Sequence, residues 1–308
     1  MKYGFLYMDY ELPEKFFVKD ILQETSLHSS SMEILEDGGL CEIPINKNRT
    51  IDYLIRNAII KMKKRVDGLV EKTYGIMLAH SVPTISPSEI SVVNLAINEL
   101  GFQNTLKVVI SGQPCSILHY ALKLSMDWLT GESLNKGVIL IGADQVYSSE
   151  ERFFFNSAMG DGVFVGFVSR ETEKNEILAC VTDTKIIATR GELSNPHNIE
   201  LFRQENPLNI RLCIEKALKE AKLEIDDIDC IIPHTPYKSL SDLISKLMKV
   251  PREKICDKYI SQTGHLNSND AFCHYISACN EGVIVKGNRV LLINPGFGGT
   301  RGCSILKV

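Results

Sequence analysis

The chain reads VVISGQPC over residues 108–115, and this stretch decides both the fold and the chemistry that the sequence predicts. Its apolar start, Val108 to Ile110, has the length and composition of a buried strand. Beyond it, apolar residues recur at helical spacing, which predicts a helix over residues 115–130. Pro114 suits the first position of a helix, so we expect Cys115 in the first turn. The unpaired N–H groups and the helix dipole there favour a thiolate, the form of cysteine that attacks thioesters.

Composition bounds the class of protein. With 308 residues, of which 44% are hydrophobic, the chain can bury an ordinary core. A net charge of −4 gives no support for nucleic acid or an anionic membrane as partner, and no apolar run approaches the roughly 20 residues of a membrane span. The nine cysteines are odd in number and form no C-x-x-C pair. They indicate a cytoplasmic protein without disulfides, and we expect no metal site.

Apolar runs of strand length alternate with helical patterns along the whole chain. The expected strands are residues 74–78, 106–110, 137–141, 163–168, 177–189 (one strand or two), 229–232 and 289–293, and residues 304–308 close the chain. The expected helices are residues 51–66, 89–100, 115–130, 210–221, 240–248 and 271–285. Alternation of this kind is typical of α/β architecture, with helices covering the sheets.

The two halves of the chain also resemble each other. Residues 115–120, CSILHY, lead through a helix and a Gly-containing turn to a buried strand, and residues 270–275, DAFCHY, do the same. Duplication explains this shared spacing and divides the chain into residues 1–170 and 171–308. In the superposition Cys115 corresponds to Asp270. Equivalent helix starts then meet at a pseudo-twofold axis, which brings Cys115 close to the Asn-rich loop before Asp270.

Short motifs spread over nearly the whole chain carry a resemblance to a known family. They are YELPE at residues 10–14, PS at 87–88, GDG at 160–162 and GFGG at 296–299, together with Cys115, His234 in IIPHTP and Asn267 in GHLNSND. In this order and spacing the chain resembles a ketoacyl-acyl-carrier-protein synthase III, a condensing enzyme of the thiolase superfamily. The resemblance implies a duplicated thiolase fold of five αβαβα layers. It also implies a homodimer whose partner closes the acyl tunnel.

The same resemblance implies roles for individual residues. Cys115 would take an acyl group from a thioester of coenzyme A or of an acyl carrier protein, with the N–H groups of Cys115 and Gly299 as the oxyanion hole. His234 and Asn267 would stabilise the enolate left when a malonyl-type thioester loses carbon dioxide. Phe297 would pack near the thiolate and keep the site dry. No metal or redox cofactor is implied, because pantetheine is only the arm that carries the substrate.

Departures from the family concern substrate binding. The segment 27–51 lacks the family's Trp and Arg platform for coenzyme A, which favours a carrier-protein donor. Arg152 matches the position of a nucleotide-contacting arginine. Arg301, near the expected mouth of the site, could bind a phosphate or an acidic acceptor. For His265 we expect only a structural role. Tyr237 replaces the family's Asn at the end of the histidine motif, and together these changes favour specialised, polyketide-type metabolism.

Three functions remain open from the sequence. The first is carbon–carbon bond formation by decarboxylative condensation, which the presence of Asn267 favours. The second is acyl transfer from Cys115 to a hydroxyl or amine, with His234 as general base and no malonyl unit. The third is a catalytically inactive or half-competent subunit of a heterodimer, against which the intact Cys, His and Asn argue.

Overall fold

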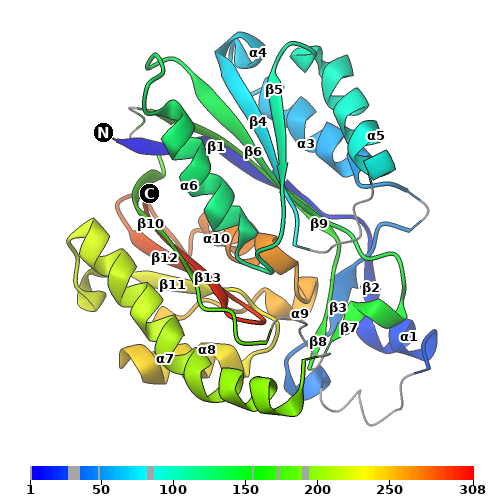
Figure 1. Ribbon diagram of the computed structural model, residues 1–308, viewed down its shortest axis with the longest axis vertical. Coiled ribbons are helices and arrows are strands. Elements are labelled where there is room, and N and C mark those ends of the chain that lie inside the picture. The colour runs from blue at the N-terminus through cyan, green and yellow to red at the C-terminus, as the bar shows by residue number, and fades with distance from the viewer. Residues whose placement is uncertain are drawn as a thin grey trace.

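A large mixed sheet organises the chain in a computed structural model, which describes residues 2–26, 35–47, 49–81, 87–154, 156–170, 172, 174–188 and 194–308 (Figure 1). The order of its strands in space is β11 (Cys230–Pro233), β12 (Arg289–Gly296), β13 (Thr300–Lys307), β10 (Glu176–Thr184), β1 (Tyr3–Glu11), β9 (Gly162–Arg170), β6 (Gly137–Asp144), β4 (Thr73–Ala79) and β5 (Leu106–Ile110). Two small ribbons stand apart from it, β2 (Lys15–Phe17) with β3 (Glu42–Pro44) and β7 (Phe153–Phe154) with β8 (Ser157–Ala158).

Both halves of the sheet follow one pattern, which is the duplication that the sequence predicts. In the first half β4 and β6 are parallel, β9 pairs antiparallel with β6, and β1 pairs antiparallel with β9. In the second half β11 and β12 are parallel, β13 pairs antiparallel with β12, and β10 pairs antiparallel with β13. The halves join where β1 meets β10 at Gly4 and Glu176. The second half begins with β10, and the exact division at residue 170 stays a prediction.

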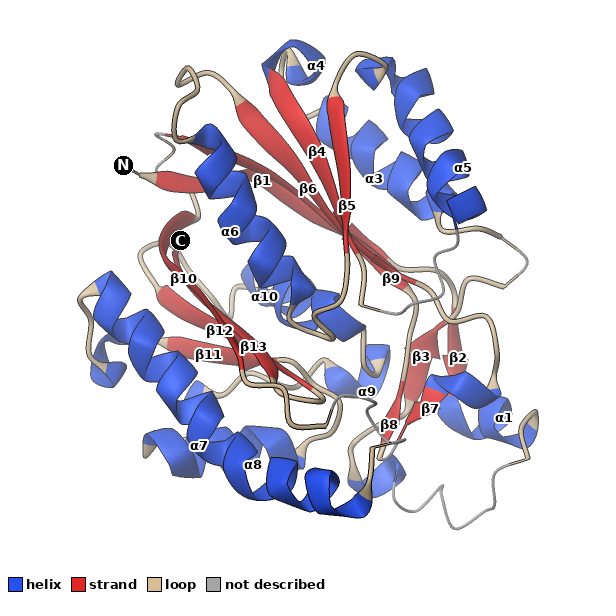
Figure 2. Ribbon diagram, in the orientation of Figure 1, coloured by secondary structure: helices blue, strands red, loops and turns tan. Residues whose placement is uncertain are grey.

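Helices complete the five layers (Figure 2). The middle layer is α6 (Ile117–Leu129) and α10 (Asp270–Asn280), which lie between the two halves of the sheet. The outer helices are α3 (Asp52–Lys63) and α5 (Pro87–Ile97) on the first half, and α7 (Pro196–Ala221) and α8 (Ser239–Met248) on the second. The shorter helices are α1 (Val18–Gln23), α4 (Leu69–Lys72) and α9 (Ile260–Thr263). The predicted αβαβα arrangement is therefore confirmed.

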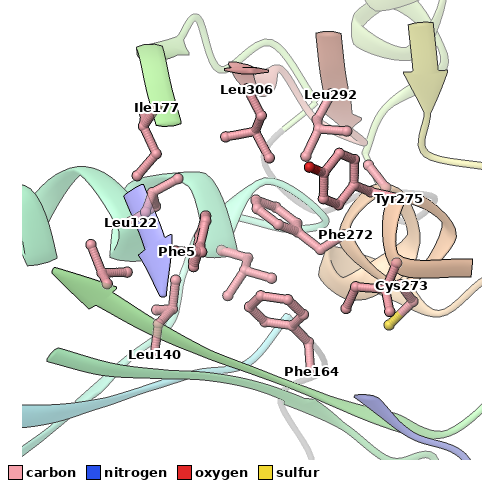
Figure 3. Packing of buried hydrophobic residues seen from close by; sticks show 14 of the residues in the cluster. Phe5, Leu122, Leu140, Phe164, Ile177, Phe272, Cys273, Tyr275, Leu292 and Leu306 are labelled. Atoms are coloured by element: carbon pink, nitrogen blue, oxygen red, sulfur yellow. The ribbon is translucent and has the colours of Figure 1, made fainter. Parts of the chain in front are cut away.

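The central core fixes the two middle helices against each other (Figure 3). Phe164 of β9 packs against Phe5 of β1 and Phe272 of α10, with ring centroids 6.1 and 5.1 Å apart. All three rings are fully buried. Burying an aromatic side chain contributes about 2–3 kcal/mol, so this cluster holds α10 firmly on the sheet. Phe272 also packs against His119 of α6, with ring centroids 4.9 Å apart, so the start of α10 has a fixed position relative to the start of α6.

Three predicted elements differ clearly from those observed. The helix expected over residues 271–285 ends at Asn280. The helix expected over residues 210–221 begins earlier, at Pro196, because the Asn195 side chain accepts a hydrogen bond from the N–H of Asn198 and caps it, and the helix continues through Pro207. The run 177–189 forms a single strand, β10, that ends at Thr184, and residue 189 lies outside the described residues. Among the helices described, none combines the length and the apolar character needed to cross a membrane.

Candidate active site

Cys115 lies in a strained turn just before α6. Its φ angle is +58°, and the N–H of Ser116 donates to the carbonyl of Pro114 at 2.7 Å, which closes a γ-turn around the cysteine. The helix itself begins at Ile117, so the prediction that Cys115 occupies the first helical turn is wrong. A non-glycine residue in this conformation costs about 1–3 kcal/mol, and such strain clusters at functional sites. The turn lifts the thiol out of the helix surface, which leaves it partly exposed.

Glycine at position 296 makes this turn possible. A Cβ atom at Gly296 would stand 1.8 Å from the carbonyl oxygen of Pro114. That same oxygen accepts a hydrogen bond from the Thr300 hydroxyl at 2.9 Å. The loop 296–299 of the second half therefore packs directly against the turn that contains Cys115.

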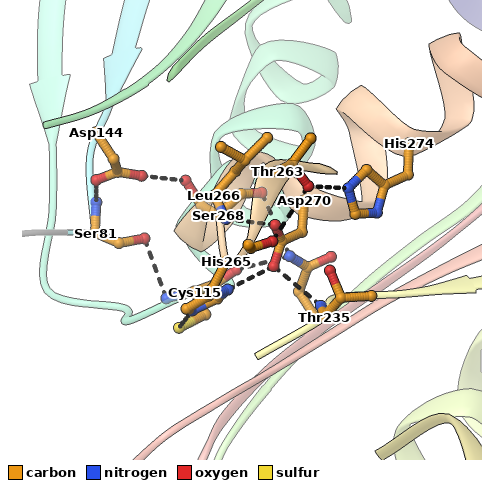
Figure 4. Close-up of polar contacts among 12 residues, drawn as sticks. Ser81, Cys115, Asp144, Thr235, Thr263, His265, Leu266, Ser268, Asp270 and His274 are labelled. Atoms are coloured by element: carbon orange, nitrogen blue, oxygen red, sulfur yellow. Dashed lines mark hydrogen bonds and ion pairs between the residues drawn. The ribbon is translucent and has the colours of Figure 1, made fainter. Parts of the chain in front are cut away.

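His265 and Asp270 complete a row of three chemically active groups with Cys115 (Figure 4). The Nε2 atom of His265 lies 3.6 Å from the Sγ of Cys115, and its Nδ1–H donates to Asp270 Oδ2 at 2.5 Å. The N–H groups of Leu266 and Thr235 also donate to the Asp270 carboxylate, at 2.5 and 3.0 Å. A nucleophile, an imidazole and an orienting carboxylate in this order are the parts of a catalytic triad. The purely structural role expected for His265 does not agree with this contact.

The contact between His265 and Asp270 favours the charged form of both side chains. Burial by itself would lower the pKa of His265, but the Asp270 carboxylate, with a smaller contribution from Cys115, raises it to about 10. Burial likewise works to raise the pKa of Asp270, and the positive charge and hydrogen bond of His265 bring it below its ordinary value. At neutral pH His265 is therefore an imidazolium held between a carboxylate and the thiol sulfur. Reactive cysteines typically lie beside such a cation.

His234 is the second imidazole beside the sulfur. Ligand atoms of Cys115, His234 and His265 all lie within 4.8 Å of one another, and the two rings stand edge to face with centroids 5.0 Å apart. Burial, and then the positive charge of His265, lowers the pKa of His234 to about 3. Its ring is therefore neutral at pH 7, and its buried Nδ1 has no hydrogen-bond partner among the described residues. The structure thus brings His234 to Cys115, as the resemblance predicts.

Asn267 lies in the loop that leads into α10. The residue is buried, has a φ angle of +56°, and its side-chain Nδ2 finds no partner within the described part of the chain. The described residues that line the cavity at Cys115 do not include Asn267. Its role in binding an enolate stays a prediction.

The two backbone donors expected in an oxyanion hole already have partners. The N–H of Cys115 donates to the Ser81 hydroxyl at 3.1 Å, and the N–H of Gly299 faces the carbonyl of Gly296 at 3.3 Å. The N–H of Ser81 in turn donates to the buried Asp144 carboxylate at 2.7 Å. An acyl oxygen would have to compete with these hydrogen bonds, so the oxyanion role of Cys115 and Gly299 stays a prediction.

A cavity of about 370 Å³ opens onto the sulfur. Phe297 lines it together with Cys115, and the Phe297 ring packs edge-on against Phe154 and Phe202, at centroid distances of 5.5 and 5.0 Å. The remaining lining residues are Asn156, Ser157, Arg203, Asn206, His234, Pro236, Tyr237, Ser239, Leu240, His265, Pro295 and Gly296. Aromatic walls with polar groups at intervals suit an acyl or pantetheine chain.

Neither arginine expected to bind substrate lines the Cys115 cavity. Arg152 is 3% exposed and donates to both oxygens of the buried Asp161, at 2.8 and 2.9 Å. Arg301 is 1% exposed and donates twice to Asp183, at 3.0 and 2.6 Å. The interpretation of Arg301 as a residue at the mouth of the site is wrong, because β13 turns its side chain under α7, beside Cys213. Arg152 therefore belongs to a buried ion pair, and the buried guanidinium of Arg301 is paired with Asp183, whose side chain is partly exposed.

Asn294 supports Cys115 through a hydrogen bond that the sequence did not indicate. The side-chain amide of Asn294 donates to the carbonyl of Cys115 at 3.0 Å, while its oxygen lies 3.0 Å from Nε2 of His119. The other ring nitrogen of His119 lies 2.8 Å from the Ser304 hydroxyl. Burial lowers the pKa of His119 to about 4, so this ring is a neutral, fully hydrogen-bonded part of the support.

Comparison with known proteins identifies relatives of this site. The family model described as 3-oxoacyl-[acyl-carrier-protein (ACP)] synthase III C terminal matches residues 218–308, which include His234, His265 and Asp270. Beta-ketoacyl-[acyl-carrier-protein] synthase III of Clostridium perfringens is 26% identical over 261 residues, which cover 76% of this chain and 77% of that protein. The enzyme of the same name from Fusobacterium nucleatum is 24% identical over 63% of this chain and 65% of that protein.

Solved structures share the fold over the full length. A structure described as "ChlB3 [Aceyltransferase]" superposes with a TM-score of 0.86 at 17% identity and covers 100% of this chain and 98% of that one. The 3-oxoacyl-[acyl-carrier-protein] synthase III of Aquifex aeolicus superposes with a TM-score of 0.80 at 22% identity, over 99% of this chain and 100% of that one. The resemblance read from the motifs is confirmed: residues 218–308 match the 3-oxoacyl-[acyl-carrier-protein] synthase III family model, and the chain as a whole is similar to these condensing enzymes in sequence and shares their thiolase fold.

Proposed function

We propose that the chain is an acyltransferase that takes an acyl group from a thioester onto Cys115 and passes it to a hydroxyl or an amine without decarboxylation. The observation that carries this proposal is the contact of His265 with the sulfur on one side and with Asp270 on the other. Enzymes that transfer acyl groups to oxygen or nitrogen need a base that removes a proton from the acceptor. An imidazole oriented by a carboxylate meets that need.

In this scheme His265 gives up one proton in the first half-reaction and takes one back in the second. The thiolate of Cys115 attacks the thioester carbonyl, the bond from that carbon to the pantetheine sulfur breaks, and the leaving sulfur takes the proton of His265. The neutral His265 then removes the proton of the acceptor, whose oxygen or nitrogen attacks the acyl carbon on Cys115. The carbon–sulfur bond breaks, and the starting pair of thiolate and imidazolium is restored.

His265 replaces His234 as the general base of this scheme. The pKa of about 3 that burial gives His234 makes it a poor base at neutral pH. Among the described residues, no carboxylate is hydrogen-bonded to the His234 ring, whereas His265 has Asp270. We therefore assign His234 to hydrogen bonding with the acyl group or the acceptor.

Decarboxylative condensation is the second candidate. It is favoured by the position of His234 within 4.8 Å of the sulfur and by the names of the relatives, which are synthases. In this reading His234 and Asn267 hydrogen-bond an enolate formed from a malonyl thioester. Either reaction would suit a cytoplasmic enzyme of fatty-acid-like or polyketide-type metabolism.

The donor and the assembly are part of the same proposal. Arg203, an exposed residue, lines the cavity beside Tyr237 and could contact the phosphate of a phosphopantetheine arm from coenzyme A or an acyl carrier protein. Strand β5 forms one edge of the sheet, and Leu106 on it is 52% exposed. An apolar sheet edge of this kind supports a homodimer that pairs the two β5 strands.

Mass spectrometry separates the candidates. The protein is incubated with an acyl-coenzyme A or acyl carrier protein, and a mass gain on Cys115 that is lost in Cys115→Ala establishes the acyl-enzyme. Loss of the acyl group to an added alcohol or amine, without carbon dioxide release from malonyl thioester, supports transfer. Carbon dioxide release with a new carbon–carbon bond would favour condensation instead. If Cys115 gains no mass, the chain is better explained as the catalytically inactive subunit of a heterodimer.

A further inference from the structure

Three soft ligands converge at the head of the cavity. They are the Sγ of Cys115 and ring nitrogens of His234 and His265, all within 4.8 Å of one another. Thiolate and imidazole are the ligands that Zn²⁺ prefers, and three protein ligands with a fourth position open is the arrangement of many accessible zinc sites. From this geometry we propose that the chain binds Zn²⁺ reversibly through Cys115, His234 and His265, and that the bound ion blocks the nucleophile.

The distance between the first two ligands already fits. Zinc–sulfur and zinc–nitrogen bonds of about 2.3 and 2.05 Å at a tetrahedral angle place the two ligand atoms about 3.6 Å apart. The Sγ of Cys115 and the Nε2 of His265 are 3.6 Å apart. The third ligand must approach to between about 3.3 and 3.6 Å from the other two. The ring nitrogen of His234 lies within 4.8 Å of both, so it must move inward by about 1 Å to complete the triangle.

The surroundings fit a zinc site as well. A zinc-bound histidine usually donates its other N–H to a carboxylate, and the Nδ1–H of His265 donates to Asp270. His234 is 4% exposed, and its buried Nδ1 has no partner among the described residues, so its ring is not committed to another contact. The cavity of about 370 Å³ supplies the route for the ion and room for a water at the fourth position. These are the features that a metal site requires.

The consequence for the enzyme is inhibition. A thiolate bound to Zn²⁺ shares its electron pair with the metal and cannot attack a thioester. Zinc displaces the Nε2 proton of His265 into solvent and occupies that nitrogen, so His265 can neither give nor take a proton and both half-reactions stop. The three ligands come from separate parts of the chain and lack the spacing of zinc motifs, so no sequence pattern indicates this site.

Cobalt and zinc titrations of the protein without acyl donor test the proposal. Co²⁺ is expected to bind with one equivalent per chain and to give a thiolate-to-cobalt charge-transfer band in the near ultraviolet. Calorimetry with Zn²⁺ should show the same stoichiometry. Cys115→Ala should abolish the band and weaken Zn²⁺ binding at least about 100-fold, and His234→Gln should weaken it at least about tenfold. Cys41→Ser and His197→Gln, at exposed positions, are the matched controls and should change neither.

A measurement on the unaltered protein avoids dependence on the variants. Zn²⁺ should protect Cys115 from alkylation by iodoacetamide, as read by peptide mass spectrometry, and a chelator should restore the reaction. Binding that persists in Cys115→Ala, an affinity unchanged in His234→Gln, or alkylation of Cys115 at full rate in the presence of zinc would each overturn the proposal. None of these measurements uses an acyl donor or acceptor, so the result is independent of the transfer reaction.

Discussion

The Nε2 atom of His265 stands 3.6 Å from the sulfur of Cys115, although 150 residues separate the two in the chain. One belongs to the turn before α6 and the other to the loop before α10, and these helices are the equivalent elements of the duplicated fold. The duplication thus gives each half a different part of the same reaction. The first half supplies the nucleophile, and the second supplies the base with its carboxylate.

Replacement of Asp270 by Asn tests the orienting role of the carboxylate. The neutral amide neither holds the His265 tautomer nor balances its charge, so transfer activity should fall about 10³–10⁴-fold. The pKa of His265, followed by NMR of its ring, should fall well below about 10. Asp257→Asn, at a carboxylate paired with Arg252 elsewhere in the chain, is the control. An unchanged rate with a normally folded Asp270→Asn variant would exclude the triad.

Asn267→Gly separates transfer from condensation. Glycine accepts the φ angle of +56° at this position, whereas alanine would add strain of about 1 kcal/mol. If transfer to a hydroxyl or amine is the reaction, acyl loading and transfer should change less than about tenfold. Removing a hydrogen-bond donor that stabilises an oxyanion lowers the rate about 10²–10³-fold. A loss of that size in product formation would show that Asn267 takes part in catalysis.

Gly296→Ala should disturb the nucleophile through the Pro114 carbonyl. The new Cβ would stand 1.8 Å from that oxygen, so the turn at Cys115 must move. A displacement of about 1 Å can cost about 100-fold in rate, and we expect at least that loss in acyl-enzyme formation. Gly131→Ala is the matched control, because a Cβ there meets nothing within 4 Å. Equal rates of acylation in the two variants would contradict the close contact.

Replacing Arg301 should lower stability, whereas replacing Arg203 should weaken binding of the acyl donor. Arg301→Ala removes a buried guanidinium from Asp183 and should lower the free energy of unfolding by about 1–3 kcal/mol, with an unchanged KM for the acyl donor. Arg203→Ala, at an exposed position on the cavity wall, should alter stability by less than about 0.5 kcal/mol and raise that KM. Urea unfolding and steady-state kinetics of both variants decide the assignment. A raised KM for Arg301→Ala alone would reverse it.

The stability of the protein should depend on pH through His265. The unfolded chain loses this proton near the ordinary histidine value of about 6.5, whereas the folded protein keeps it up to about pH 10. A raised pKa in the folded state stabilises fully below about pH 6.5, and this contribution declines as the pH rises from 6.5 to 10. Urea unfolding over that range should show a decline that is smaller in His265→Gln. Parallel curves for the two proteins would contradict the imidazolium.

Local pattern alone determined much of this protein. The alternation of apolar runs and helical periodicity predicted the strands and helices, because each period reflects which faces of an element are buried. The repeat of CSILHY in DAFCHY predicted the duplication, and with it the meeting of Cys115 and the loop before Asp270. The position of Cys115 after a strand and a proline predicted the nucleophile's neighbourhood. Each of these features can be recognised within short stretches of sequence or by comparing two such stretches.

Only the tertiary structure decided which histidine contacts the sulfur and where the arginines go. His265 and Asp270 lie five residues apart across a helix start, a signal that became readable once both were seen to face Cys115. Arg301 was expected at the mouth of the site, but the register of β13 with β10 places it opposite Asp183. Side-chain direction at a turn or on a strand depends on backbone angles and on packing between distant segments. No local pattern in the sequence encodes that packing, and the folded core alone fixes it.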